Sequence, residues 1–226
     1  MIIITGASGG IGSYLSRDLI KHDKLIGIYN KNKPKVKNSK IILEKIDLTD
    51  LKQIKQFVKK YNKKFNNLTL INCAAYKEDQ LAINTDLENW NKTININLTG
   101  SFLITKEILK LMIKNKYGRL VFLSSSGALQ GAPGTSSYTA SKAGVVGLSK
   151  VISREYAQFN ITSNVLNLGA FDTGLYKKLN DNIKKNILST IPSKKLGRLI
   201  NISNCIKFLI KSEFVNGSVI DINGGA

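Results

Sequence analysis

The sequence is poor in the residues that build metal centres and disulfide frameworks. Its 226 residues include one histidine, His22, and two cysteines, Cys73 and Cys205. Two cysteines are too few for a disulfide framework or a zinc site, and a single histidine argues against a dehydrogenase that holds a metal through histidines. We therefore expect no metal, two buried thiols in a reducing cytoplasm, and His22 at the surface or at a helix end.

The sequence also lacks a long apolar run. No run approaches the ~18 residues that a membrane span requires, although 42% of the residues are hydrophobic, which argues against disorder. The first strand-like run begins at Ile2, which leaves no room for a signal peptide. We expect one α/β domain over residues 1–226, located in the cytoplasm, with no membrane partner.

Acidic residues are scarce relative to basic ones, since 15 Asp and Glu stand against 34 Lys and Arg, giving a net charge of +19. Such a balance can attract nucleic acid, anionic membrane or an acidic partner. The lysines are scattered among Asn and Ile, however, as codon bias alone would produce. No basic motif interleaved with aromatic residues, typical of nucleic-acid modules, is present. We therefore do not expect a nucleic-acid partner.

A glycine-rich turn follows the first apolar run. Residues 2–4 read as a buried strand and lead into Thr5-Gly6-Ala7-Ser8-Gly9-Gly10-Ile11-Gly12. In a strand-to-helix turn, Gly6 would allow the tight turn, Gly10 the approach of a pyrophosphate, and Gly12 close packing of the helix on the sheet. A plain tight turn is the alternative, but the strand-then-helix context favours a nucleotide site.

Tyr138 and Lys142 are four residues apart, and Ser125 lies thirteen residues before the tyrosine. On a helix, positions i and i+4 share a face, so the ammonium of Lys142 would lie beside the phenol of Tyr138. A nearby cation favours phenolate and lowers its pKa, so that the phenol can exchange protons with a carbonyl or an alcohol. The alternative is a surface Tyr-Lys pair, which is common on helices.

Strand-like and helical patterns alternate along the chain, which predicts a doubly wound parallel sheet with ligands at the carboxyl ends of its strands. The expected strands are 2–5, 25–29, 41–46, 69–72, 120–123, 162–166 and 219–222. The expected helices are 12–22, 51–61, 87–114, 138–159 and 202–210.

Together these motifs resemble those of the short-chain dehydrogenase/reductase family, over nearly the whole chain. The resemblance rests on the glycine turn, Asp47-Leu48, Asn72-Cys73-Ala74-Ala75, Asn97-Leu98-Thr99-Gly100, Ser125, Tyr138 and Lys142. Cys73 and Ala75 depart from the usual Asn-Asn-Ala-Gly, and Leu168-Gly169 from the usual Pro-Gly. The family implies a Rossmann-type sheet of seven strands in the order 3-2-1-4-5-6-7.

The resemblance also implies roles for four residues. Tyr138 would be the general acid in reduction and the base in oxidation, and Lys142 would lower its pKa and hold the nicotinamide ribose. Ser125 would orient the substrate oxygen. Asn97 would anchor a water that links Lys142 to solvent; from the residues alone, it reads as a helix-interior Asn bonded to backbone.

Cofactor preference depends on the end of the second strand, where the chain reads Tyr29-Asn30-Lys31-Asn32-Lys33. This segment has no carboxylate, and its basic residues could reach a 2′-phosphate, so we expect NADP(H) rather than NAD(H). One feature points the other way: Gly9 stands where relatives that prefer NADP often carry Arg or Lys. Asp47 would meet the adenine edge or, alternatively, cap the next helix. The full expected cofactor set is Gly6, Ser8, Gly10, Ile11, Asn30, Lys31, Asp47, Leu48, Asn72, Ala74, Tyr138, Lys142, Phe171 and Thr173.

The segment near residues 170–196 would form a lid over the substrate. An apolar face of Phe171, Leu175, Tyr176, Leu179, Ile183 and Ile187 would oppose Lys177, Lys178, Lys184 and Lys185; an ordinary surface helix pair is the alternative. The chain looks most similar to 3-oxoacyl-[acyl-carrier-protein] reductases, whose carrier is acidic. Lys116 matches one of the basic docking positions of those enzymes, whereas Phe159 replaces the other.

We therefore expect an oxidoreductase that transfers hydride between NAD(P)(H) and a ketone or secondary alcohol, most simply a 3-oxoacyl thioester, and that assembles as a homotetramer or homodimer. The small residues Ala140, Ala143, Gly144 and Gly147 would permit the close helix packing of such an assembly. One rival is a reductase of a sugar or polysaccharide precursor. A rival of another class is a non-catalytic nucleotide- or nucleic-acid-binding protein that uses the +19 charge.

Overall fold

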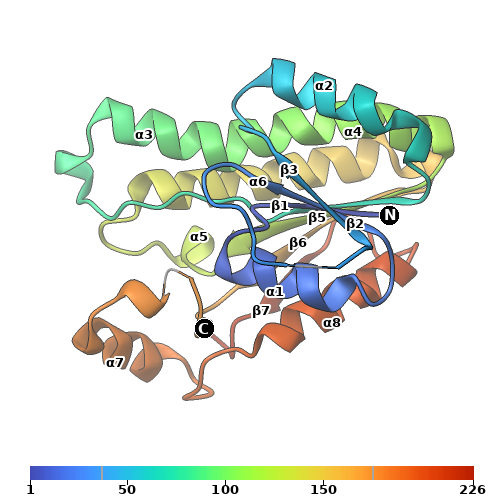
Figure 1. Ribbon diagram of the computed structural model, residues 1–226. Helices are drawn as coiled ribbons and strands as arrows, with labels where there is room; N and C mark the ends of the chain where they lie inside the picture. Colours follow the sequence, from blue (N-terminus) through green and yellow to red (C-terminus); the bar gives the residue numbers. More distant parts are fainter. Residues whose placement is uncertain (37, 175) are drawn as a thin grey trace.

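The computed structural model describes residues 1–36, 38–174 and 176–226. Its centre is a parallel sheet of seven strands in the order β3-β2-β1-β4-β5-β6-β7 (Figure 1). The strands are β1 Ile2–Thr5, β2 Leu25–Tyr29, β3 Ile41–Lys45, β4 Leu68–Asn72, β5 Gly118–Ser125, β6 Ile161–Leu168 and β7 Val219–Ile222. The predicted Rossmann-type sheet and its strand order are confirmed.

The central strands are buried on both faces. All residues of β1 and of β4 are buried, and parallel strands covered on both sides read as continuous apolar runs, which is why the sequence revealed them. β5 and β6 extend beyond their predicted limits because polar residues lie hidden inside them. Ser124 donates a hydrogen bond to the Lys142 carbonyl (3.0 Å), and the Asn167 amide donates to the Asp221 carboxylate (2.5 Å).

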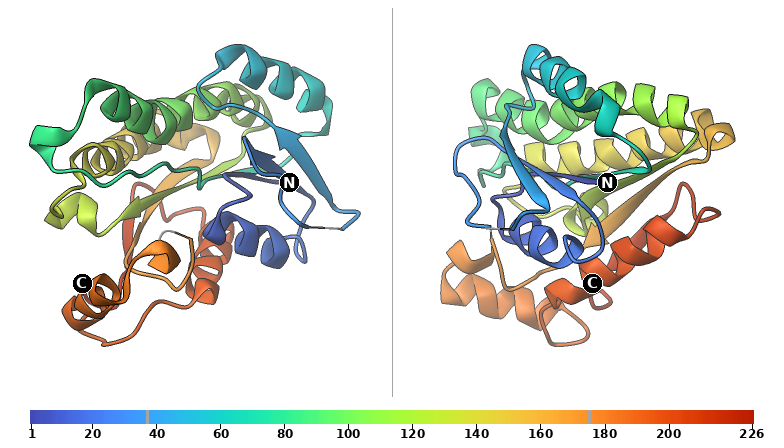
Figure 2. Two further views of the ribbon diagram at one scale, coloured as in Figure 1. Left: turned by 60° about the vertical axis from the view of Figure 1, so that its left-hand side comes forward. Right: turned by 45° about the vertical axis from the view of Figure 1, so that its right-hand side comes forward.

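Helices cover the two faces of the sheet as separate layers (Figures 1 and 2). The helices of one layer, α2 Leu51–Tyr61, α4 Gly100–Asn115 and α6 Ser136–Glu155, bury Phe57, Ile108 and Val145 on one face. On the other face, α1 Gly10–Leu19 and α8 Leu199–Lys211 bury Leu15 and Ile206. The sheet therefore separates two apolar cores, one on each of its faces.

The long helix predicted over residues 87–114 is wrong as a single helix. The structure divides it into α3 Leu87–Ile94, a π-helical segment Asn95–Thr99, and α4. π-Helical turns are rare and occur frequently at functional sites. Apolar periodicity does not reveal such a turn, because the widening changes the phase of the pattern only slightly. Asn97 lies inside this segment.

The region expected to form a lid contains a 3-10 turn, Tyr176–Lys178, and α7, Asp181–Thr190. α7 stands beside the C-terminal residues (Figure 2), where the Ser193 amide donates to the Gly224 carbonyl (3.1 Å). The predicted amphipathic face is wrong at two positions: Ile183 is 43% exposed, whereas Lys184 is half-buried. Leu175 and the side chain of Lys178 lie outside the described residues.

Short helices not predicted from the sequence complete the path of the chain. They are the 3-10 turns Asn62–Lys64 and Ala82–Asn84, and α5 Gly127–Gln130. Within the described ranges, none of the helices has both the length and the apolar character needed to cross a bilayer.

Candidate active site

Three neighbouring strands, β1, β4 and β5, end at one edge of the sheet, and the candidate residues follow them. Thr5 closes β1, and its hydroxyl accepts hydrogen bonds from the backbone amides of Cys73 (3.0 Å) and Ala74 (3.1 Å). The segment that departs from the family pattern is therefore held in place by Thr5. Sequence reasoning had assigned Thr5 no separate role.

The glycine turn is packed so tightly that side chains have no room. Gly6 has φ +66°, and a Cβ there would lie 2.7 Å from the Cα of Ala74. Gly9 is the N-cap of α1 and supplies no side-chain cap, so the first amides of the helix are free to meet an anion. A Cβ on Gly10 would lie 2.0 Å from Oγ1 of Thr173. The residues present therefore fit a pyrophosphate at the N-terminus of α1.

We expect Gly12→Ala to lower the free energy of unfolding by about 1–3 kcal/mol, the usual cost of overpacking. A Cβ at Gly12 would lie 2.2 Å from the carbonyl oxygen of Gly6, which is backbone and cannot swing aside. Gly147→Ala in α6 is the matched control: nothing lies within 4 Å of its Cβ, and alanine gains up to about 1 kcal/mol in a helix. Urea unfolding measures both, and equal effects would contradict the packing argument.

At the carboxyl ends of β2 and β3, Asn30 and Asp47 lie side by side. The backbone amide of Thr49 holds the pKa of the Asp47 carboxyl below its ordinary value, and the Thr49 hydroxyl and Asn30 assist. Asp47 does not cap the next helix, because Asp50 is the N-cap of α2 and accepts from two of its amides. The alternative reading of Asp47 as a helix cap is thus wrong. Lys31 and Lys33 follow Asn30 in the sequence and are exposed.

Ser125 lies beside the Tyr138 phenol, close enough to influence its protonation. Burial raises the pKa of the Tyr138 phenol to about 12, and Ser125 only partly offsets this. The predicted lowering of the phenol pKa by Lys142 is wrong, since the pKa is raised instead. The reason is geometric: Nζ of Lys142 lies 5.6 Å from the ring centre and donates to the carbonyl of Leu123 (2.8 Å).

Lys142 is 4% exposed, and burial lowers the pKa of its ammonium to about 8. Cys73 lies close enough to interact with it, but burial raises the pKa of this thiol to about 12, so the thiol remains protonated at neutral pH. The site therefore contains a neutral phenol and a poorly solvated cation on one helix.

Asn97 is buried at the π-helical segment and its amide is fully engaged. Oδ1 accepts from the Tyr76 amide (2.7 Å), while Nδ2 donates to the Tyr76 carbonyl (2.9 Å) and to the Ser141 hydroxyl (3.0 Å). Asn97 thereby ties the segment after β4 to α6. The water relay expected for Asn97 stays a prediction.

The other expected cofactor residues differ in how deeply they are buried. Asn72 is 3% exposed and donates to Thr105 (3.1 Å), and its Oδ1 has no partner among the described residues. The ring of Phe171 is buried in the core beside Gly197. Leu48 is also buried, and Ile11 is half-buried, whereas Ser8 is exposed.

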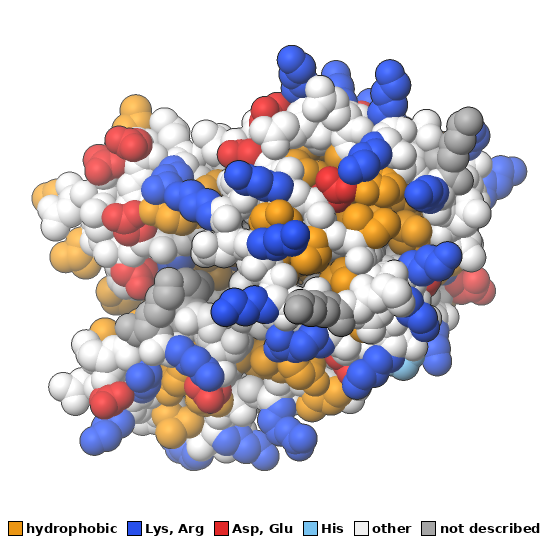
Figure 3. Space-filling view, in the orientation of Figure 1, with side chains coloured by type: hydrophobic (Ala, Val, Ile, Leu, Met, Phe, Trp, Pro, Cys, Tyr) orange, Lys and Arg blue, Asp and Glu red, His pale blue; other side chains and the backbone are white. Residues whose placement is uncertain are grey.

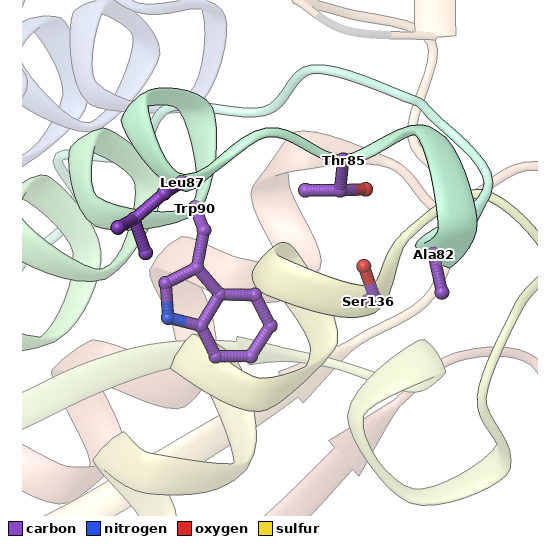
Figure 4. Close-up of a pocket in the computed structure, with 5 residues that line it drawn as sticks. All are labelled: Ala82, Thr85, Leu87, Trp90 and Ser136. Atoms are coloured by element: carbon purple, nitrogen blue, oxygen red, sulfur yellow. The ribbon is translucent and has the colours of Figure 1, made fainter.

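One residue that sequence reasoning did not single out is Lys77, whose Nζ lies 5.7 Å from the centre of the Tyr138 ring. Its position soon after the end of β4 was the signal that could have found it, because the carboxyl ends of parallel strands carry ligand sites. A separate cavity of about 320 Å³ lies near the start of α6 and is lined by Ala82, Thr85, Leu87, Trp90 and Ser136 (Figure 4).

No group of three or more metal-ligating side chains occurs in the described parts of the chain. The site combines a glycine turn that fits a pyrophosphate with a phenol that lies near a serine and a lysine, all on a doubly wound sheet. These features define a nucleotide-dependent oxidoreductase of the tyrosine–lysine type. Residues 1–184 match the family model for short chain dehydrogenases, and the chain belongs to this family. It is an NAD(P)-dependent enzyme.

Proteins similar to this chain match it over nearly its whole length. The 3-oxoacyl-[acyl-carrier-protein] reductase FabG of Rickettsia conorii (strain ATCC VR-613 / Malish 7) is 33% identical over 99% of this chain and 95% of its own length. Nodulation protein G of Rhizobium sp. (strain N33) is 29% identical over the same shares. A solved structure of ElxO with NADP bound superposes with a TM-score of 0.90 at 29% identity, covering 99% of this chain and 97% of that one.

Proposed function

We propose that this enzyme reduces the ketone of a 3-oxoacyl thioester with NADPH. The observation that carries the proposal is the Tyr138 phenol, held protonated next to Ser125 with the Lys142 ammonium behind it. A protonated phenol is the acid that ketone reduction needs. Relatives named 3-oxoacyl-[acyl-carrier-protein] reductase, at 33% identity over 99% of the chain, supply the substrate class.

Each side chain has a distinct role in the proposed reaction. The nicotinamide, when bound, supplies the hydride. Ser125 donates a hydrogen bond to the ketone oxygen and orients it, and Tyr138 gives that oxygen its proton. Lys142 stabilises the phenolate that forms and holds the ribose. Asn97 positions Tyr76 and Ser141, and the amides at the N-terminus of α1 bind the phosphates.

A preference for NADPH would come from the exposed ammonium groups of Lys31 and Lys33, because no carboxylate lies on residues 29–33. We expect NADPH to bind more tightly than NADH in a fluorescence titration. Changing both lysines to Gln should weaken NADPH binding about 10-fold or more, the loss of one or two hydrogen bonds to a charged group, and leave NADH binding unchanged. Lys40→Gln in the same loop is the control, and equal losses for both nucleotides would refute the assignment.

The substrate is tested by NADPH oxidation with an acetoacetyl thioester and, in parallel, with ketone sugars. Turnover of the thioester supports the proposal, whereas turnover of sugars alone would favour a reductase of sugar precursors. NADPH binding with no turnover on either class, together with steeply salt-dependent RNA binding, would favour the non-catalytic rival. On the face shown in Figure 3, Lys and Arg are spread over the whole surface instead of forming one stripe.

Docking of an acidic acyl carrier through Lys116 has a geometric difficulty within one chain. Lys116 precedes the amino end of β5, whereas Ser125 closes its carboxyl end, and eight strand residues span about 23 Å. We therefore propose that Lys116 serves a carrier only if the chain assembles as a homodimer or homotetramer. The face that we propose for this assembly lies on α6. It consists of the exposed residues Ala140, Ala143 and Gly147, together with Val151 (52% exposed).

A further inference from the structure

Lys77 places a second cation over the ring of Tyr138. Its Nζ lies 5.7 Å from the centre of the phenol ring, nearly the same distance as Nζ of Lys142 (5.6 Å). Unlike the deeply buried Lys142, the Lys77 side chain is 22% exposed and remains accessible to a ligand. If a ketone bound at the Tyr138 hydroxyl, the groups attached to its carbonyl carbon would lie near this ammonium.

The segment that carries Lys77 is fixed at both of its ends. The backbone of Tyr76 is bonded on both sides by the Asn97 amide (2.7 and 2.9 Å). At the other end, the Gln80 amide donates to the Gly134 carbonyl (2.9 Å), just before α6. A residue held between two such anchors keeps its position when a ligand arrives, which lowers the cost of binding.

The partner that Lys77 has in the structure can be exchanged. Nζ contacts both carboxylate oxygens of Asp79, at 2.9 and 3.0 Å, and the Asp79 side chain is 49% exposed. Exposed ion pairs of this kind contribute about 0–1 kcal/mol. An oxygen atom of a bound substrate can therefore take the place of Asp79, or share the ammonium with it.

We propose that Lys77 determines substrate specificity by binding the oxygen of the group next to the reacting ketone, either the carbonyl of a 3-oxoacyl ester or thioester or the carboxylate of a 3-oxo acid. This inference rests on the proposed function and names the residue that would recognise the second oxygen function of the substrate. Lys77 neither donates the proton nor binds the nucleotide; it positions the substrate.

The test compares acetoacetate, ethyl acetoacetate and 2-pentanone, each reduced with NADPH. Lys77→Met should lower kcat/KM for the first two ketones about 10-fold or more, mainly through KM, as the loss of one charged hydrogen bond predicts. For 2-pentanone, which has no second oxygen, kcat/KM should change less than about threefold. A larger loss for acetoacetate identifies the carboxylate as the ligand; equal losses identify the carbonyl. Lys77→Arg should retain most of the activity.

Lys92→Met is the matched control, because Lys92 stacks on the Tyr76 ring (4.3 Å) of the same segment. This variant should alter kcat/KM by the same factor for all three ketones. Equal losses on all three ketones for Lys77→Met, or the same pattern for Lys92→Met, would overturn the proposal. If wild-type enzyme binds NADPH and reduces none of them, the proposed reaction fails. Calorimetric binding of acetoacetate to the NADP complex then decides on Lys77, since binding unchanged by Lys77→Met would exclude its role.

Discussion

Tyr138→Phe is expected to lower turnover with NADPH and an acetoacetyl thioester by about 10²- to 10⁴-fold, the contribution of a positioned general acid. The substitution removes the hydroxyl that Ser125 contacts and leaves the ring in place. Tyr138 is only one of fourteen expected cofactor residues, so the affinity for NADPH measured by fluorescence should change far less than turnover. Phenylalanine fills the same volume, so the fold should also persist.

Tyr76→Phe is the control for this experiment. The Tyr76 hydroxyl is bonded to Glu78, and its loss should leave turnover at the wild-type level. Wild-type turnover by Tyr138→Phe would show that another group supplies the proton. The pH profile adds a second criterion: with a phenol pKa of about 12, the acid for reduction stays protonated at neutral pH, whereas alcohol oxidation should accelerate as the pH rises.

Lys142→Met is expected to abolish most of the activity and yet to stabilise the folded protein. Burial lowers the pKa of Lys142 from 10.5 to about 8, so at neutral pH the folded state carries the cost of a buried charge. At 1.36 kcal/mol per pKa unit this cost is about 3 kcal/mol as an upper bound. Methionine has similar volume without the charge, and removing a buried ion can stabilise a protein.

The sign of the pH dependence follows from proton binding. Between pH 8 and 10.5 the unfolded chain binds the proton that folded Lys142 releases, so the stability of the wild type rises with pH in that window. The difference between wild type and Lys142→Met should therefore be largest below pH 8 and shrink toward pH 10. Urea unfolding at pH 7 and pH 9.5 measures it. A variant less stable than wild type at pH 7 would show that the bond to the Leu123 carbonyl outweighs desolvation.

The same titration affects catalysis. Above pH 8 the Lys142 ammonium loses its proton, and with it the charge that would stabilise the phenolate of Tyr138. Reduction at saturating NADPH should therefore fall as the pH rises above about 8, even though Tyr138 itself remains protonated. Stability and activity thus change in opposite directions around this single ammonium.

The sequence by itself determined where the buried strands and the glycine turn lie, because both depend on local patterns, whereas the strand order was implied only by the resemblance to the family. Continuous apolar runs such as residues 2–4 mark buried parallel strands, and the spacing of Gly6, Gly10 and Gly12 reflects the geometry of a single turn. The four-residue spacing of Tyr138 and Lys142 is equally local, since it depends only on the helix period.

Only the tertiary structure decided the electrostatics of the site and its long-range neighbours. The phenol pKa rises to about 12 because other segments bury Tyr138, and Lys142 turns to the carbonyl of Leu123 on β5. Lys77 reaches Tyr138 because Asn97 and Gly134 anchor its segment from distant parts of the chain. Periodicity in a sequence reports the neighbours along one element, whereas burial and pairing between elements depend on how the whole chain packs.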